Sequence, residues 1–358
     1  RDVVVVGLVP KRAVDAFMFA FTLPNMLRDM LGEGAVNAAF VPVFSACAEE
    51  ESKAAFRELV RACLGAMMLV FGVLTLTGVL MMPLLDEALG LVHKVTGMPV
   101  KGPGEVAELV SLLRWTFPYL FFIGLAAFAS APLFVVRRYG AASWSPTLLN
   151  LALMGACLGL HSRFENPAWG LVVGVWIGGI AQLGVMFWEM WRRAGVFWPR
   201  FRLGHPGVRR CFWLLGPVVL GQSFGEVNKL VDSLFALDIG AVRELFVANR
   251  LVQFPLSIFG VAVAVAVLPS ISRAAARGAR EEIRETLIAG LRLSCFLILP
   301  AMVGLFLLGE PVIRLLFERG EFGAAATFMS TRALWLYGAG LLSFAWIKVT
   351  VQGFYAVQ

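Results

Sequence analysis

The sequence predicts an all-α protein, a polytopic bundle of membrane helices. Of its 358 residues, 59% are hydrophobic and only 15% are charged, whereas soluble domains carry about 25% charged residues. Several apolar runs reach about 20 residues, the length that a helix needs to cross a bilayer. These charged side chains are too few to cover the surface of a soluble protein of this size. The excess apolar surface must therefore face lipid. A soluble enzyme, a nucleic-acid-binding protein and a disordered chain are therefore excluded.

The charge, cysteines and histidines support this interpretation. The net charge of +7 does not indicate a nucleic-acid partner, because the arginines lie between apolar runs and do not gather on one polar face. The five cysteines have no CxxC spacing and share no ligand spacing with the three histidines. We therefore expect no metal site. Neither residue type belongs to a constellation of nucleophile and base that an enzyme would need.

Ten apolar stretches are the predicted membrane helices. Five of them are free of charge over about 20 residues, and the others are shorter or are interrupted by charges, proline or glycine. In chain order the ten are 3–9, 17–46, 62–85, 115–136, 141–160, 167–188, 214–237, 251–272, 293–309 and 327–354. Because the chain starts inside the first stretch and stops inside the last, we expect it to be a piece of a longer protein.

The positive charges of the loops predict the orientation. Loops after even-numbered helices carry about twice as many Lys and Arg residues as loops after odd-numbered helices. Positively charged loops remain in the cytoplasm. The amino end is therefore expected on the cytoplasmic side of a bacterial inner membrane.

A weak internal repeat predicts the domain organisation. The segment Ala39–Ser45 resembles Ala266–Ser272, which follows it by 227 residues, and the same offset relates two Arg-Glu pairs. Two parallel repeats around a central cavity are a plan that transporters use. We therefore predict a bundle over 1–193, a basic cytoplasmic linker over 194–212 and a second bundle over 213–358. An accidental similarity between apolar segments is the alternative.

Charged residues inside the second and eighth predicted helices indicate what the cavity binds. An arginine at the bilayer centre costs about 2.5–3.5 kcal/mol on insertion scales, so it normally faces a cavity or a partner. We expect Arg28 and Arg250 to approach each other across the interface between the bundles. Their guanidinium groups match phosphate oxygens in pairs of hydrogen bonds, which favours a lipid phosphate or pyrophosphate. Pairing with Asp15, Asp29 or Glu33 inside a bundle is the alternative.

The seventh predicted helix carries three charged residues on one face. Glu226, Lys229 and Asp232 follow one another at a spacing of three, which places them within about 120° around the helix. Glu226 and Lys229 are expected to pair. Two interpretations of Asp232 stay open: it binds a cation or a proton, or it is a second partner of Lys229.

The motifs of the second helix resemble those of the MurJ/MviN family, the lipid II flippases of the multidrug/oligosaccharidyl-lipid/polysaccharide exporter superfamily. The resemblance rests on Asp15-Ala16-Phe17, on Leu-Pro-Asn-Met-Leu-Arg at 23–28, on Glu33-Gly34-Ala35 and on Ala-Phe-Val-Pro-Val at 39–43. It continues in order through 116–119, 145–150, 249–255, 268–270 and 353–355. It therefore covers nearly the whole chain.

The resemblance implies a flippase of fourteen helices, of which this chain would hold about ten. It implies that Arg1, Arg28 and Arg250 are cavity arginines that bind the headgroup of the substrate. It also implies that Asp15 and Glu33 occupy acidic positions of the motif in the second helix.

Three further positions concern ions and headgroup preference. The resemblance implies that Asp232 matches an acidic residue that contributes to a sodium site in some members. Two residues depart from the family pattern: Asp29 stands where a second basic residue is common, and Gln253 where an acidic one is common.

The function expected from these features is the transfer of lipid II, an undecaprenyl-pyrophosphoryl muropeptide, from the inner to the outer leaflet by alternating access. We expect no bond chemistry, hence no enzyme, and no cofactor; coupling to Na⁺ or to the membrane potential stays open. Membrane lipids and the machinery of cell-wall synthesis are further expected partners. The alternatives are a sister exporter of another polyprenyl-linked glycan, a multidrug exporter, which should carry acids in place of Arg28 and Arg250, and a membrane enzyme that processes polyprenyl phosphates.

Overall fold

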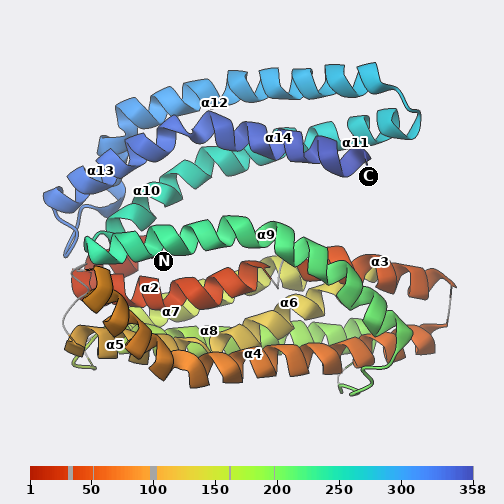
Figure 1. The fold of residues 1–358 in the computed structure, drawn as a ribbon, viewed down its shortest axis with the longest axis horizontal. Helices are drawn as coiled ribbons and strands as arrows, with labels where there is room; N and C mark the ends of the chain where they lie inside the picture. Colours follow the sequence, from red (N-terminus) through yellow and green to blue (C-terminus); the bar gives the residue numbers. More distant parts are fainter. Residues whose placement is uncertain (31–34, 51, 97–102, 161–162, 197, 358) are drawn as a thin grey trace. The chain divides into compact units, whose positions relative to one another are not determined.

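The computed structural model describes the whole chain except residues 31–34, 51, 97–102, 161–162, 197 and 358. The described residues form helices and no strand; their one isolated β-bridge joins Arg319 and Phe322. The predicted all-α fold is therefore confirmed (Figure 1). In the amino-terminal part the helices are α1 (Asp2–Leu8), α2 (Lys11–Arg28), α3 (Ala35–Glu50), α4 (Lys53–Thr96), α5 (Pro103–Thr116), α6 (Tyr119–Val135), α7 (Gly140–Leu160), α8 (Ala168–Ala194) and α9 (Pro206–Asp238). They are followed by α10 (Val242–Pro255), the π-helix η2 (Leu256–Val261), α11 (Ala262–Ala276), α12 (Arg280–Phe317), α13 (Ala324–Ala339) and α14 (Leu341–Val357).

The chain divides into two compact units, Arg1–Gly240 and Ala241–Gln358. Helix α9 belongs to the first unit, where it packs against α2, α3 and α4. The sequence predicts that most of α9 belongs to the second bundle, which starts at residue 213. The two divisions therefore differ in the placement of residues 213–240, and the bundle boundary remains a prediction.

In the first unit, α6 is the central helix. It contacts α3, α4 and α8, and most of its side chains are buried. The rings of Phe40 and Phe44 on α3 meet the ring of Phe128 on α6 edge to face, at centroid distances of 5.5 and 6.2 Å. Such aromatic pairs stabilise by about 0.5–1.5 kcal/mol beyond the burial of their area. They fix α3, which also packs on α9, against α6.

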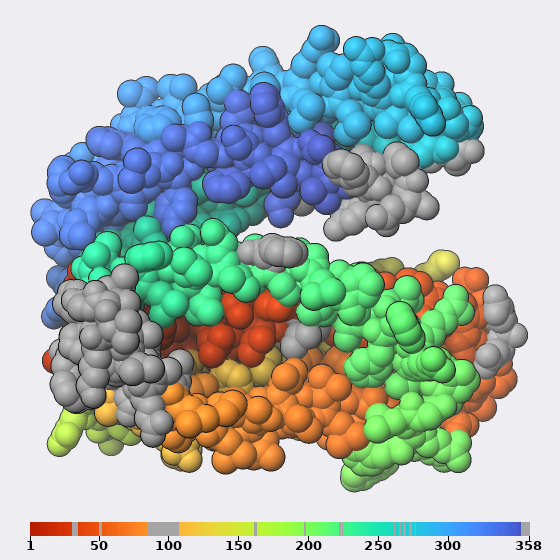
Figure 2. All heavy atoms as spheres, in the orientation of Figure 1, coloured from red at the N-terminus to blue at the C-terminus, as the bar shows by residue number. Residues whose placement is uncertain are grey.

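The outer face of α4 is apolar and exposed. Val73, Leu76 and Leu80 are at least 60% exposed, and Figure 2 shows this helix in orange along one side of the first unit. An exposed apolar face of this length would be unfavourable in water and matches the hydrocarbon of a bilayer.

The second unit consists of α10, η2 and α11 to α14. Helix α13 packs on α10 and α12, while α14 packs on α11 and α12. Helices α13 and α14 meet at a bend of 43°.

Six helices of the described chain are long and apolar enough to cross a membrane, or seven if α13 with α14 is one span. With α13 and α14 taken as one span, they correspond to seven of the ten predicted stretches. A multi-pass membrane protein is therefore confirmed. Three predicted stretches fall outside this set: 3–9, 17–46 and 214–237. The first corresponds to α1, which has only 7 residues, and the second is divided between the separate helices α2 and α3. The third lies in α9, which is interrupted by polar residues. Their place in the membrane remains a prediction.

The helix boundaries follow the offset of the predicted repeat. Helix α3 begins at Ala35 and α11 at Ala262, and α4 begins at Lys53 and α12 at Arg280, each pair being 227 residues apart. A π-helical turn begins at Asp29, and η2 begins at the matching position, Leu256. π-Turns inside helices frequently lie at functional sites. The pseudo-repeat itself remains a prediction, which this agreement supports.

Candidate functional site

The end of α2 places a charged pair against α9. Arg28 is the last residue of α2, where a cation interacts favourably with the helix dipole. Its Nε and Nη2 donate to Oδ1 of Asp29, at 3.0 and 2.6 Å. Both side chains are largely enclosed, at 20% and 28% exposure. The alternative to phosphate binding was that Arg28 pairs with an acidic residue inside its bundle, and the structure shows this pair with Asp29; a role of Arg28 in binding phosphate remains a prediction.

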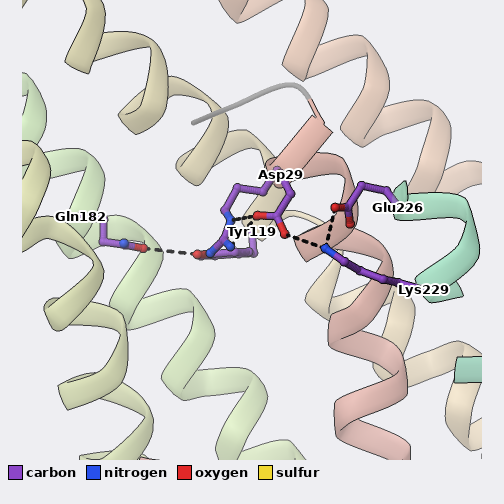
Figure 3. Close-up of polar contacts among 6 residues, drawn as sticks. Asp29, Tyr119, Gln182, Glu226 and Lys229 are labelled. Carbon is purple, nitrogen blue, oxygen red and sulfur yellow. Dashed lines mark hydrogen bonds and ion pairs between the residues drawn. The ribbon is translucent and has the colours of Figure 1, made fainter. Parts of the chain in front are cut away.

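Two residues of α9 extend this pair into a cluster. Lys229 donates to Oε1 of Glu226 at 2.5 Å, and its Nζ lies 4.0 Å from Oδ2 of Asp29. Figure 3 shows Asp29 facing Lys229, which lies beside Glu226 on α9. We call Arg28, Asp29, Glu226 and Lys229 the α2–α9 charge cluster. The predicted pairing of Glu226 with Lys229 is confirmed, whereas the link to Asp29 was not predicted.

A second polar contact in Figure 3 joins α6 to α8. The hydroxyl of Tyr119 donates to Oε1 of Gln182 at 3.3 Å, and both side chains are buried. The ring of Tyr119 packs against Phe21 of α2, with a centroid distance of 5.5 Å. This contact fixes α2 against the centre of the first unit.

The other predicted site residues of the first unit lie elsewhere. Arg1 pairs with Asp2 at 2.6 Å and donates to Oδ1 of Asn150 on α7 at 3.1 Å. Asp15 lies in α2 and is only 2% exposed. Glu33 lies outside the described residues.

Arg250 belongs to the second unit. It lies on α10, where its side chain is exposed and its guanidinium carbon is 5.9 Å from the centroid of the Phe246 ring. Arg28 belongs to the first unit, and the predicted approach of Arg250 to Arg28 remains a prediction.

Asp232 lies one turn beyond Lys229 on α9 and is partly exposed. In the described part of the chain the acidic partners of Lys229 are Glu226 and Asp29, so the interpretation of Asp232 as a second partner is not supported. No group of three or more His, Cys, Asp and Glu side chains that could hold a metal ion occurs among the described residues. A cation at Asp232 would need further ligands.

A comparison with models of protein families shows the family of this chain. The model of the family described as lipid II flippase MurJ matches residues 10–358. The chain belongs to the MurJ family. The family resemblance found in the sequence motifs is therefore confirmed.

Curated relatives agree with this membership. A protein of Vibrio cholerae serotype O1 named probable lipid II flippase MurJ is 34% identical, over 100% of this chain and 69% of its own length. A protein of Burkholderia cenocepacia named lipid II flippase MurJ is 32% identical, over 96% of this chain and 67% of its own length.

Solved structures share the fold. A lipid II flippase MurJ in an inward closed conformation has a TM-score of 0.79 at 22% identity, and the match covers 100% of this chain and 72% of that one. An inward-facing multidrug resistance transporter of the MATE family and MOP superfamily has a TM-score of 0.74 at 15% identity, covering 99% of this chain and 81% of that one. The MurJ-family chain therefore has the fold that MurJ proteins and MATE transporters share.

Proposed function

We propose that this chain acts as a lipid II flippase of a bacterial inner membrane. Its membership of the MurJ family, its relatives' names and its multi-pass helical fold support this function. The observation that carries the proposal in the structure is Arg28, a largely enclosed guanidinium in a chain with an apolar outer surface. A charge in such surroundings is costly and normally marks a substrate path.

The chemistry of Arg28 suits a lipid pyrophosphate. A guanidinium stays charged at every accessible pH and binds phosphate oxygens through two parallel hydrogen bonds. Arg28, with Arg1 and Arg250, would bind the pyrophosphate of lipid II in a cavity open to the cytoplasm. Asp15 and Glu33 would set the position of these cations. Neutralising the pyrophosphate lowers the cost of carrying the polar headgroup through the apolar centre of the membrane.

Transport would proceed by alternating access between a cytoplasmic and an outer opening. The substrate changes its side and keeps its bonds, so the function is transport and not catalysis. An inside-negative membrane potential, with sodium at Asp232 as an additional candidate, would drive the return of the protein. The amino end would lie on the cytoplasmic side, and the machinery that polymerises the cell wall would receive the substrate.

A sister exporter is the second candidate, because the chain shares its fold with a MATE transporter at a TM-score of 0.74. The arginines favour an anionic substrate over the cationic drugs that an acidic cavity would bind. Family membership favours lipid II among anionic lipid-linked substrates.

Complementation tests the proposal. The full-length gene should restore growth to bacteria depleted of their own lipid II flippase, and Arg28→Ala and Arg250→Ala should abolish this rescue at equal expression. Arg193→Ala is the matched control, since among the residues that the structure describes Arg193 pairs with Glu189, in its own helix α8. Failure of the unmodified gene would favour the sister exporter. Full rescue by both arginine variants would contradict the role of the arginines.

A further inference from the structure

The α2–α9 charge cluster contains two cations and two anions, so its formal charge is zero. Asp29 lies between the cations: its Oδ1 accepts both hydrogen bonds from Arg28, and its Oδ2 lies 4.0 Å from Nζ of Lys229. One carboxylate therefore interacts with cations from two different helices.

Asp29 uses the edge of Arg28 that a phosphate would use. Nε and Nη2 of an arginine form a planar fork that binds carboxylate and phosphate oxygens in the same geometry. Here both atoms donate to one carboxylate oxygen, at 3.0 and 2.6 Å. A phosphate group can occupy this edge only when Asp29 leaves it. Asp29 therefore competes with an anionic substrate.

Lys229 is placed to share that substrate. It is the most exposed member of the cluster, at 50%, whereas Glu226 is 13% exposed. Its ammonium carries three donors on a flexible stem, and its contact with Asp29 is long, at 4.0 Å. An anion that approaches Arg28 in place of Asp29 therefore meets a second cation, whose ammonium has donors for it besides the hydrogen bond to Glu226.

We propose that Lys229 is a substrate-binding residue, which together with Arg28 binds the pyrophosphate of the lipid-linked substrate, and that Asp29 is the internal counter-ion which the pyrophosphate displaces. The inference rests on the proposed function. A pyrophosphate offers two anionic groups and can therefore accept one cation from α2 and one from α9. The return of Asp29 to both cations restores the neutral cluster and favours release of the substrate.

Binding measurements on the purified full-length protein test the inference. The probes are undecaprenyl pyrophosphate and uncharged undecaprenol, compared by native mass spectrometry. Because a hydrogen bond to a charged group contributes about 1.5–3 kcal/mol, Lys229→Gln should weaken binding of the pyrophosphate about tenfold or more. It should leave undecaprenol binding unchanged. Lys229→Arg should bind like the unmodified protein, and Asp29→Asn should bind the pyrophosphate more tightly.

The opposite signs of the two neutralising variants separate this role from a structural one. If the cluster only fastened α9 to α2, Lys229→Gln and Asp29→Asn would both lower the melting temperature and weaken binding. Arg193→Gln removes a cation from a pair within α8 and should change neither quantity.

Three outcomes would overturn the inference. In the first, Lys229→Gln binds the pyrophosphate as well as the unmodified protein does, while Arg28→Ala loses this binding; the proposed function would then stand without Lys229. In the second, Asp29→Asn weakens binding together with Lys229→Gln. In the third, the unmodified protein does not prefer undecaprenyl pyrophosphate over undecaprenol, and the proposed function fails as well.

Discussion

The guanidinium of Arg57 lies against the left-handed turn at Gly195. Gly195 ends α8 with φ of 69° and ψ of 26°, a conformation that glycine adopts without strain. Nε of Arg57, on α4, donates to the carbonyl of Ala194 at 3.3 Å. A Cβ atom on Gly195 would lie 2.8 Å from the same nitrogen. The glycine therefore permits both the turn and the contact between α8 and α4.

Replacing Gly195 by alanine should destabilise the protein. The left-handed conformation costs an alanine about 1–2 kcal/mol, and the new methyl group would displace Arg57. Unfolding in detergent micelles should show a loss of about this size. Gly184→Ala is the matched control in the same helix, where a Cβ would meet no atom within 4 Å; it should not lower stability, because alanine favours helices. Equal losses in both variants would refute the explanation.

The close packing of α7 and α8 depends on Gly178. A Cβ at this position would lie 2.9 Å from Cα of Leu149 on α7. Small residues allow membrane helices to approach so closely. Gly178→Leu should therefore separate the helices and lower the free energy of unfolding by about 1–3 kcal/mol or more. The measurement is the yield of monodisperse protein in gel filtration, together with its melting temperature.

Gly155→Leu is the control for this variant. Gly155 lies on α7, and a Cβ there would meet no atom within 4 Å. Its yield and melting temperature should stay close to those of the unmodified protein. A normal yield of Gly178→Leu would show that this contact does not hold the two helices together.

The second unit contains a buried ion pair at the start of α10. Arg243 and Glu244 are each 2% exposed and 3.2 Å apart. Arg243 also donates to the carbonyl of Glu321 at 3.2 Å and lies over the ring of Phe322 at 4.9 Å. It thereby joins α10 to the turn between α12 and α13.

Arg243→Met should destabilise the second unit by about 3–5 kcal/mol, because it leaves the buried carboxylate of Glu244 without this cation. The double variant Arg243→Met/Glu244→Leu should recover much of the loss. Arg314→Met, which removes an exposed cation from pairs with Glu310 and Glu318, should cost less than about 1 kcal/mol. Chemical unfolding in micelles measures all three. A small loss for Arg243→Met would contradict the structural role of the buried pair.

Hydropathy alone predicted the helices that face lipid. The stretches 141–160 and 167–188 closely match α7 and α8, because a charge-free run of this length has no other stable form in a membrane. The neighbours of α9 could not be predicted in this way. They depend on which side chains pack together across the chain, and α9 packs with α2 and α3, far from it in sequence.

The charge cluster shows the same limit. Its local pair, Glu226 with Lys229, follows from helical spacing. Its long-range pair, Asp29 with Lys229, follows from the packing of α2 on α9, which no local pattern encodes. The signal that could have found it was the departure of Asp29 from the family pattern, since a carboxylate has a second oxygen that can face a cation of a neighbouring helix.

The orientation of the chain can be tested at two open glycines. Gly204 lies in the arginine-rich loop before α9, and Gly323 precedes α13; a Cβ at either would meet no atom within 4 Å. The positive charge near Gly204 predicts that this loop is cytoplasmic. Three predicted membrane helices separate Gly204 from Gly323, so the turn at Gly323 is expected on the outer side. A membrane-impermeant maleimide applied to intact spheroplasts should therefore label Gly323→Cys and not Gly204→Cys.

The labelling experiment contains its own controls. Four of the five native cysteines are buried and Cys295 is partly exposed, so the unmodified protein gives the background signal. Disrupting the membrane should make Gly204→Cys reactive, because this position is open and only the bilayer protects it. The reverse pattern, with Gly204→Cys labelled in intact spheroplasts, would place the arginine-rich loop outside. The positively charged loops would then no longer support a cavity that opens to the cytoplasm.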